Sequence, residues 1–159
     1  MYKPTLEEIK GLAAQGNLVP IYREIDADLE TPVSAYLKVA NPPYSFLLES
    51  VEGGERMARY SFIGTEPYAT IITGPGYPLG QIDPLVPIKA ELDNYRIVPN
   101  SDLPSFHGGA VGYLAYEVAR YFEPRVPIPD LDNLGLPESL FMLTDTLLIF
   151  DHLAHSIKV

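Results

Sequence analysis

Proline is spread along the whole chain and limits how long any helix or strand can be. The sequence has 16 prolines among 159 residues, about twice the usual frequency of roughly 5%. Each proline lacks a backbone N–H and therefore interrupts the hydrogen bonding of a helix interior or a central strand. We expect short elements and many chain reversals, and not a helix bundle.

The composition is that of a globular protein with a real core. Hydrophobic residues make up 47% and charged residues 20% of the chain, whose length is that of one ordinary domain. The net charge of −10 argues against electrostatic binding to nucleic acid or to anionic membranes. The absence of cysteine excludes disulfides and thiol chemistry. The N-terminus is unlike a signal peptide and the apolar runs are too short to cross a bilayer, so we expect a cytoplasmic location.

Helix and strand signals follow one another irregularly. Thr5 with Glu8 forms a capping box for a helix ending near Gly16, and Thr31-Pro32 begins a second helix. Asp83-Pro84 begins a third helix. Strands are expected at 18–25, 45–51, 58–64 and 68–73, within 106–124, and as two strands within 139–159, with 45–73 forming a three-stranded meander. Many strands with a few scattered helices predict an α+β fold built on antiparallel sheets.

Polar residues with catalytic potential do not assemble into a recognisable site. His152 and His155 flank an expected turn and His107 lies in an expected loop, without the three protein ligands that a zinc site needs. Glu117 and Glu123 are six residues apart, and nothing indicates that they converge as general acid and base. We predict no catalytic residue and no metal ligand in this segment.

A glycine-rich stretch, GGAVG at 108–112, has two possible interpretations. It lacks the Lys and Ser/Thr of a phosphate-binding P-loop and the spacing of a dinucleotide-binding loop. Glycine within a strand usually permits a bend or the close approach of another backbone. We therefore predict a structural role for these glycines.

The stretch LLESVEGGERMARYSFIG, residues 47–64, places Glu49 and Ser50 at the end of an apolar strand. In one interpretation Glu49 faces solvent and Ser50 begins the turn. In the other, both face a ligand, because a buried carboxylate needs a cation such as an ammonium group. Arg59, across the hairpin, is an alternative cation for Glu49, or would bind a ligand carboxylate. The residues alone leave both interpretations open.

Three segments resemble, in the same order, the N-terminal region of anthranilate synthase component I, a member of the chorismate-utilising enzyme family. They are PIYREIDADLETPVSAYLKV (20–39), FLLESVEGGERMARYSFIGTEP (46–67) and LPSFHGGAVGYLAYEVARYFEP (103–124). The resemblance implies antiparallel β-sheets packed as a sandwich with flanking helices. Residues 1–159 would be a regulatory and scaffold region, with the C-terminal chorismate-binding catalytic region absent. Because the chain stops at Val159 within an expected strand, we expect a longer natural protein.

The resemblance also implies an activity for the full-length protein. It would convert chorismate and ammonia to anthranilate and pyruvate in tryptophan biosynthesis, with ammonia supplied from glutamine by a partner glutamine amidotransferase, component II. Mg²⁺ would be bound in the C-terminal region, so no cofactor is expected here. The feedback site for L-tryptophan would include Glu49 and Ser50, with Arg59 and Tyr60 as weaker candidates.

Three alternatives remain at this point. Aminodeoxychorismate synthase component I shares the implied architecture and can retain a tryptophan pocket. A free-standing amino-acid-binding module of 159 residues is a second alternative. A scaffold that only docks the amidotransferase is the third.

Overall fold

The computed structural model describes residues 1–49, 59–127 and 135–159, which form two compact units. Unit 1 consists of Met1–Pro67, Tyr95–Gly109 and Thr144–Val159. Unit 2 consists of Tyr68–Asn94 and Ala110–Leu143. The chain length alone predicted one such unit. No helix within the described ranges is long and apolar enough to cross a membrane.

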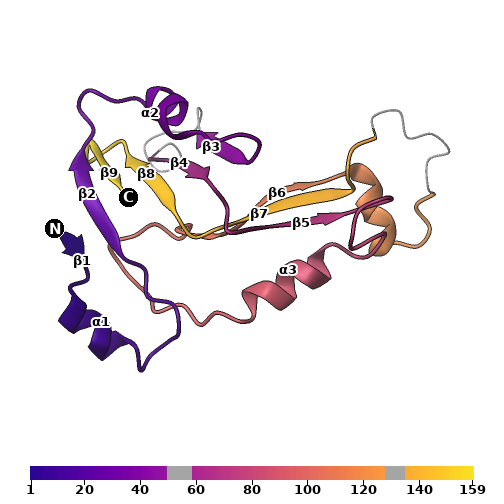
Figure 1. Cartoon of the computed structure of the whole chain (residues 1–159), viewed down its shortest axis with the longest axis horizontal. Helices are drawn as coiled ribbons and strands as arrows, with labels where there is room; N and C mark the ends of the chain where they lie inside the picture. Colours follow the sequence, from indigo (N-terminus) through magenta and orange to yellow (C-terminus); the bar gives the residue numbers. More distant parts are fainter. Residues whose placement is uncertain (50–58, 128–134) are drawn as a thin grey trace. The chain divides into compact units, whose positions relative to one another are not determined.

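Unit 1 is built on a six-stranded sheet in which each pair of neighbours runs antiparallel. The sheet brings strands from both ends of the sequence together, since β9 lies between β2 and β8 (Figure 1). In spatial order its strands are β1 (Tyr2–Lys3), β2 (Tyr22–Asp26), β9 (Ser156–Lys158), β8 (Leu147–Asp151), β4 (Tyr60–Thr65) and β3 (Ser45–Glu49).

Two helices of unit 1 begin as their capping residues predict. Helix α1 (Leu6–Leu12) follows a capping box in which Thr5 and Glu8 exchange hydrogen bonds. Helix α2 (Pro32–Val39) begins at Thr31, whose side chain accepts a hydrogen bond from the Ser34 amide. Both caps satisfy amides that lack partners in the first helical turn. The local sequence therefore predicts both helix starts correctly.

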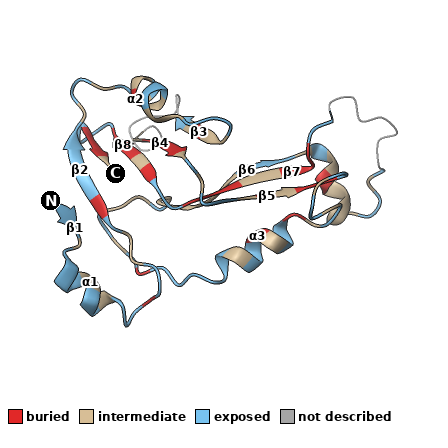
Figure 2. Cartoon of the chain, viewed as in Figure 1, coloured by how far each residue is buried: buried red, intermediate tan, exposed pale blue. Residues whose placement is uncertain are grey.

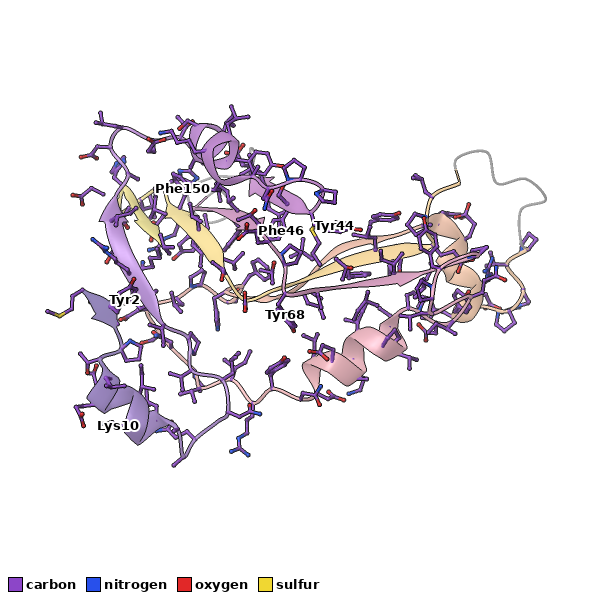
Figure 3. All side chains as sticks on the ribbon, viewed as in Figure 1. Tyr2, Lys10, Tyr44, Phe46, Tyr68 and Phe150 are labelled. Carbon is purple, nitrogen blue, oxygen red and sulfur yellow. The ribbon has the colours of Figure 1, made fainter. Side chains whose placement is uncertain are left out.

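The two faces of the six-stranded sheet contact different segments. Residues directly opposite each other on paired strands share a face, so the register separates Phe46 from Phe150, both labelled in Figure 3. The Phe150 face packs against α2 through a cluster of buried side chains. On the other face, the ring of Phe62 meets Phe106 edge-on at 5.2 Å between centroids. Ala35, Ile63, Phe150 and Ile157 form the buried cluster beneath α2.

Unit 2 is a three-stranded sheet with one helix packed against it. Its strands are ordered β5 (Ala69–Thr73), β7 (Ser139–Thr144) and β6 (Gly109–Leu114). Helix α3 (Leu85–Leu92) buries Ile88 against Ile71 of β5 and Leu143 of β7. A 3₁₀ helix, η1 (Tyr116–Tyr121), follows β6. Buried positions are frequent on the central strand β7, whereas much of α3 is exposed or half-buried (Figure 2).

The predicted α+β class and its antiparallel sheets are confirmed, but the strand connections differ from two expectations. The meander over 45–73 is wrong, because β5 pairs with β7 in the other sheet and not with β4. Glu66, at φ 49°, and Pro67 end β4 and allow the chain to leave its sheet. Segment 139–159 forms three strands and not two, since the chain changes sheets at Asp145-Thr146.

The predicted structural role of the glycines at 108–112 is confirmed. Gly108 and Gly109 have φ angles of 150° and 117°, which side chains rarely permit. A Cβ atom on Gly112 would lie 1.9 Å from the carbonyl oxygen of Leu140 on β7. The first two glycines therefore allow the bend that enters β6, and the third allows the close approach of a neighbouring backbone.

Candidate functional site

The candidate site is the end of the β3–β4 pair at which β3 finishes with Glu49. Glu49 lies directly opposite Ser61 of β4, which in turn lies opposite Phe150 of β8. This register puts the three residues in one row on the sheet face that packs against α2. Glu49 itself is exposed, and none of the described residues forms a hydrogen bond or ion pair with it. Ser50 lies outside the described residues.

A buried hydroxyl next to Glu49 is provided by Ser61. Ser61 is only 2% exposed, and its Oγ lies 2.8 Å from Nε2 of His152. The His152 ring stacks near Phe150, with 6.4 Å between centroids. The row beside Glu49 therefore combines one polar hydroxyl–imidazole pair with the buried ring of Phe150, which belongs to the core cluster.

Arg59 pairs with Asp151, and not with Glu49 as one of the two sequence interpretations proposed. Arg59 Nε donates to Asp151 Oδ1 at 3.1 Å, and Nη2 donates to Oδ2 at 2.7 Å. The Asp151 side chain is 1% exposed, whereas that of Arg59 is 41% exposed. Asp151 Oδ1 also accepts hydrogen bonds from the amides of Leu153 and Ala154. One buried carboxylate thus holds both the β8–β9 turn and the residue that leads into β4.

Tyr60 lies on the opposite face of the sheet from Glu49, because it follows Arg59 and precedes Ser61 in an extended strand. Its ring is 4.8 Å from the Arg59 guanidinium carbon and 6.2 Å from the ring of Phe62. Glu49 and Tyr60 are therefore close along the ladder but do not share a face. A ligand contacting both would have to bind at the end of the strands.

Two residues that the sequence interpretation did not assign to the site are Asp151 and His152. Asp151 is the last residue of β8 and His152 is the first residue of the following turn, and the prediction that His152 and His155 flank this turn is confirmed. Asp151 and Arg59 are 92 positions apart, so no local pattern relates them. The local signal was a charged residue at the end of the apolar run that forms β8, and an aspartate before a turn is a common feature.

Glu123, one of the two acids considered as a general acid–base pair, forms an ion pair with Arg125 at 3.0 Å, an exposed interaction of little energetic weight. Over the residues that the structure covers, no group of three or more His, Asp or Glu side chains is arranged to hold a metal ion.

Asp151 is expected to make stability depend on pH. Burial by itself raises the pKa of Asp151, but hydrogen bonds from Arg59 and two backbone amides outweigh burial and keep the pKa below its ordinary value of 3.8. A lowered folded-state pKa stabilises the protein above the unfolded value, and this contribution is lost as pH falls through the folded value. Asp151→Asn should lower the free energy of unfolding by about 1–3 kcal/mol at neutral pH.

Urea unfolding at a series of pH values checks this expectation. The wild-type free energy of unfolding should fall more steeply below about pH 4 than that of Asp151→Asn, because the variant has no carboxylate to protonate at this position. Equal pH slopes for the two proteins would contradict the assignment.

Curated proteins similar in sequence to this chain share one name. The chain is 45% identical over 159 residues to a probable anthranilate synthase component 1 from Schizosaccharomyces pombe, covering 98% of this chain and 31% of the relative. It is 39% identical to anthranilate synthase component 1 from Acetivibrio thermocellus, covering 100% of this chain and 34% of the relative. The chain therefore spans about a third of the length of the curated relatives it matches. No family model matches.

A solved structure supports the same relationship. The crystal structure of anthranilate synthase component I from Streptococcus pneumoniae aligns with a TM-score of 0.52 and 28% sequence identity. The alignment covers 84% of this chain and 30% of that structure. Sequence and fold therefore indicate the same group of proteins.

Proposed function

We propose, from the premise that this chain is a homologue of the N-terminal portion of anthranilate synthase component 1, that the full-length protein makes anthranilate. In that reaction chorismate and ammonia give anthranilate and pyruvate. The observation that carries the proposal is 38–45% identity to curated relatives of that name along nearly the whole chain. The activity would require the remaining two thirds of the relatives' length, where we expect chorismate and Mg²⁺ to bind.

Mg²⁺ is proposed to bind in the part of the full-length protein that lies outside this chain. In proteins Mg²⁺ is usually held by one or two carboxylates together with waters and substrate oxygens. We assign this segment no step that involves the metal. A glutamine amidotransferase, component II, would supply the ammonia, and the name component 1 of the relatives supports a partner of this kind.

Regulation by L-tryptophan is the proposed role of the β3–β4 end. Glu49 supplies an exposed carboxylate for an ammonium group, and Phe150 and the Ser61–His152 pair lie in the same row or beside it. Arg59 supplies a cation for the ligand carboxylate. Ser50 and Tyr60 complete the proposed set. Ligand binding away from the chemistry inhibits only when the ligand prefers a low-activity arrangement of the enzyme.

The reaction is tested with the full-length protein, chorismate, ammonia and Mg²⁺, by identifying the product. Anthranilate is the expected product. Exclusive formation of aminodeoxychorismate would overturn the assignment and favour aminodeoxychorismate synthase component I. A full-length protein that binds an amino acid but turns over no chorismate would favour a binding module.

Glu49→Gln is expected to weaken tryptophan inhibition of the full-length enzyme by tenfold or more. A charge-assisted hydrogen bond contributes about 1.5–3 kcal/mol, and each 1.4 kcal/mol corresponds to about a factor of ten. The measurement is the tryptophan concentration that halves each variant's own uninhibited rate.

Glu66→Gln provides a matched control for Glu49→Gln. Glu66 is another exposed acid of unit 1 and accepts a hydrogen bond from Asn41. This variant should respond to tryptophan as the wild type does. Unchanged inhibition in Glu49→Gln, or equal changes in both variants, would show that Glu49 is not part of the feedback site.

A further inference from the structure

Asp151 holds one edge of the Arg59 guanidinium group in a fixed orientation. Its two carboxylate oxygens accept from Nε at 3.1 Å and from Nη2 at 2.7 Å. Such a two-point contact fixes the guanidinium plane as well as its position. The carboxylate is itself held by the Leu153 and Ala154 amides at 3.1 and 3.2 Å, and its side chain is 1% exposed. It is therefore a rigid support.

The other edge of Arg59 remains available for a ligand. A guanidinium has five N–H donors, and the contact with Asp151 uses the side of the group that carries Nε. The opposite side, formed by Nη1 and the second hydrogen of Nη2, can still donate two parallel hydrogen bonds to a carboxylate. Among the described residues, only Asp151 accepts a side-chain hydrogen bond from Arg59. With 41% of its side chain exposed, Arg59 can be reached by a small molecule.

The Tyr60 ring further restricts the guanidinium group. Its centroid lies 4.8 Å from the Arg59 guanidinium carbon, within the usual range of a cation–π contact. An arginine held by a buried carboxylate and an aromatic ring loses less conformational freedom when it binds a ligand than a freely rotating one does.

We infer that Asp151 is a positioning residue of the amino-acid site, orienting Arg59 so that its remaining edge receives the ligand's carboxylate. The inference rests on the proposed tryptophan site and deepens it, because it assigns to Asp151 and Arg59 the recognition of one chemical group of the ligand. Asp151 acts through Arg59 and does not contact the ligand. This role predicts that loss of Asp151 weakens the binding of ligands that carry a carboxylate more than the binding of ligands that lack one. General destabilisation of the protein would weaken the binding of both kinds of ligand.

The test is calorimetric titration of the full-length protein with L-tryptophan and with L-tryptophanamide, which lacks the carboxylate. Asp151→Asn should weaken tryptophan binding on the order of tenfold and change tryptophanamide binding by less than about twofold. Asp102→Asn is the matched control, since Asp102 is another carboxylate of unit 1 and accepts a hydrogen bond from buried Tyr22 at 3.0 Å. The control should bind both ligands as the wild type does.

Arg59→Lys tests the orientation even if Asp151→Asn does not fold. Lysine keeps the positive charge but cannot be fixed in a plane by a two-point contact. The variant should therefore lose most of the preference for tryptophan over tryptophanamide.

Each outcome has a separate meaning. An unchanged preference in Asp151→Asn or in Arg59→Lys, or equal weakening of both ligands by Asp151→Asn, would overturn the inference while leaving the site in place. A wild-type protein that binds neither ligand would overturn the proposed tryptophan site, and the inference with it.

Discussion

Replacing Gly112 with alanine is expected to separate β6 from β7 and to destabilise unit 2 by about 3 kcal/mol or more. The added Cβ atom would lie 1.9 Å from the carbonyl oxygen of Leu140 and 2.6 Å from the Cα atom of Phe141. Both atoms belong to backbone, so rotation of a side chain cannot relieve the overlap. The strands must move apart and lose hydrogen bonds of the ladder.

Thermal unfolding and amide hydrogen exchange measure this effect. A loss of about 3 kcal/mol corresponds to a decrease of roughly 6–12 °C in Tm for a chain of this size. Amides of β6 and β7 should lose protection first, because the damage is local to their sheet.

Gly11→Ala is the matched control for Gly112→Ala. Gly11 lies within α1, and a Cβ atom there meets nothing within 4 Å. Alanine in a helix interior is favoured over glycine by about 0.5–1 kcal/mol, so this variant should be as stable as the wild type or more stable. A Gly112→Ala protein with wild-type Tm and wild-type exchange would show that β6 does not approach β7 as described.

The second large effect is expected at a buried ion pair in unit 2. Arg120 Nη2 donates to Glu138 Oε1, and the two side chains are only 12% and 9% exposed. Tyr121 Oη donates to Glu138 Oε2 at 2.7 Å, and Gln81 Nε2 donates to Oε1 at 3.2 Å. The hydrogen bond from Arg120 to Tyr121 raises the pKa of Arg120, and the negative charge of Glu138 raises it further. Together they keep this pKa above its ordinary value, although burial lowers it.

Glu138→Leu should therefore destabilise the protein by about 3–5 kcal/mol, because it leaves the charge of Arg120 buried without its carboxylate. Urea unfolding near neutral pH is the measurement. The double variant Arg120→Met/Glu138→Leu should recover most of this loss, since two apolar side chains of similar size remove the uncompensated charge. A double variant less stable than Glu138→Leu alone would contradict this explanation.

Features that depend on neighbouring residues could be predicted from the sequence. Thr5 with Glu8, and Thr31 followed by Pro32, predicted two helix starts correctly, since a cap involves residues only three positions apart. The apolar runs predicted most strands, because a strand that borders a core repeats its pattern every two residues. The assignment of strands to sheets failed at 45–73 and at Asp145-Thr146, since pairing between strands depends on contacts distant in the sequence.

The candidate site divides in the same way. The LLES segment identifies Glu49 as a candidate because polar residues end an apolar strand there. The resemblance to a known family then predicts that Glu49 and Ser50 contact L-tryptophan. The role of Arg59 could not be predicted without its partner Asp151, which lies 92 positions away. Similarly, no local pattern distinguishes Ser61 within the strand expected at 58–64, but the register places it opposite Glu49 and its hydroxyl lies 2.8 Å from Nε2 of His152.

The sequence by itself determined the α+β class, the helix starts, the structural use of the glycines at 108–112 and the relationship to a family. These properties depend on the composition, on residues only a few positions apart, and on segments whose sequence matches that of the family. Only the tertiary structure decided that β5 leaves the first sheet, that Glu49 and Tyr60 lie on opposite faces, and that Asp151 holds Arg59. The reason is physical: an antiparallel register, and an ion pair formed on a buried carboxylate, join residues whose separation along the chain leaves no local signal.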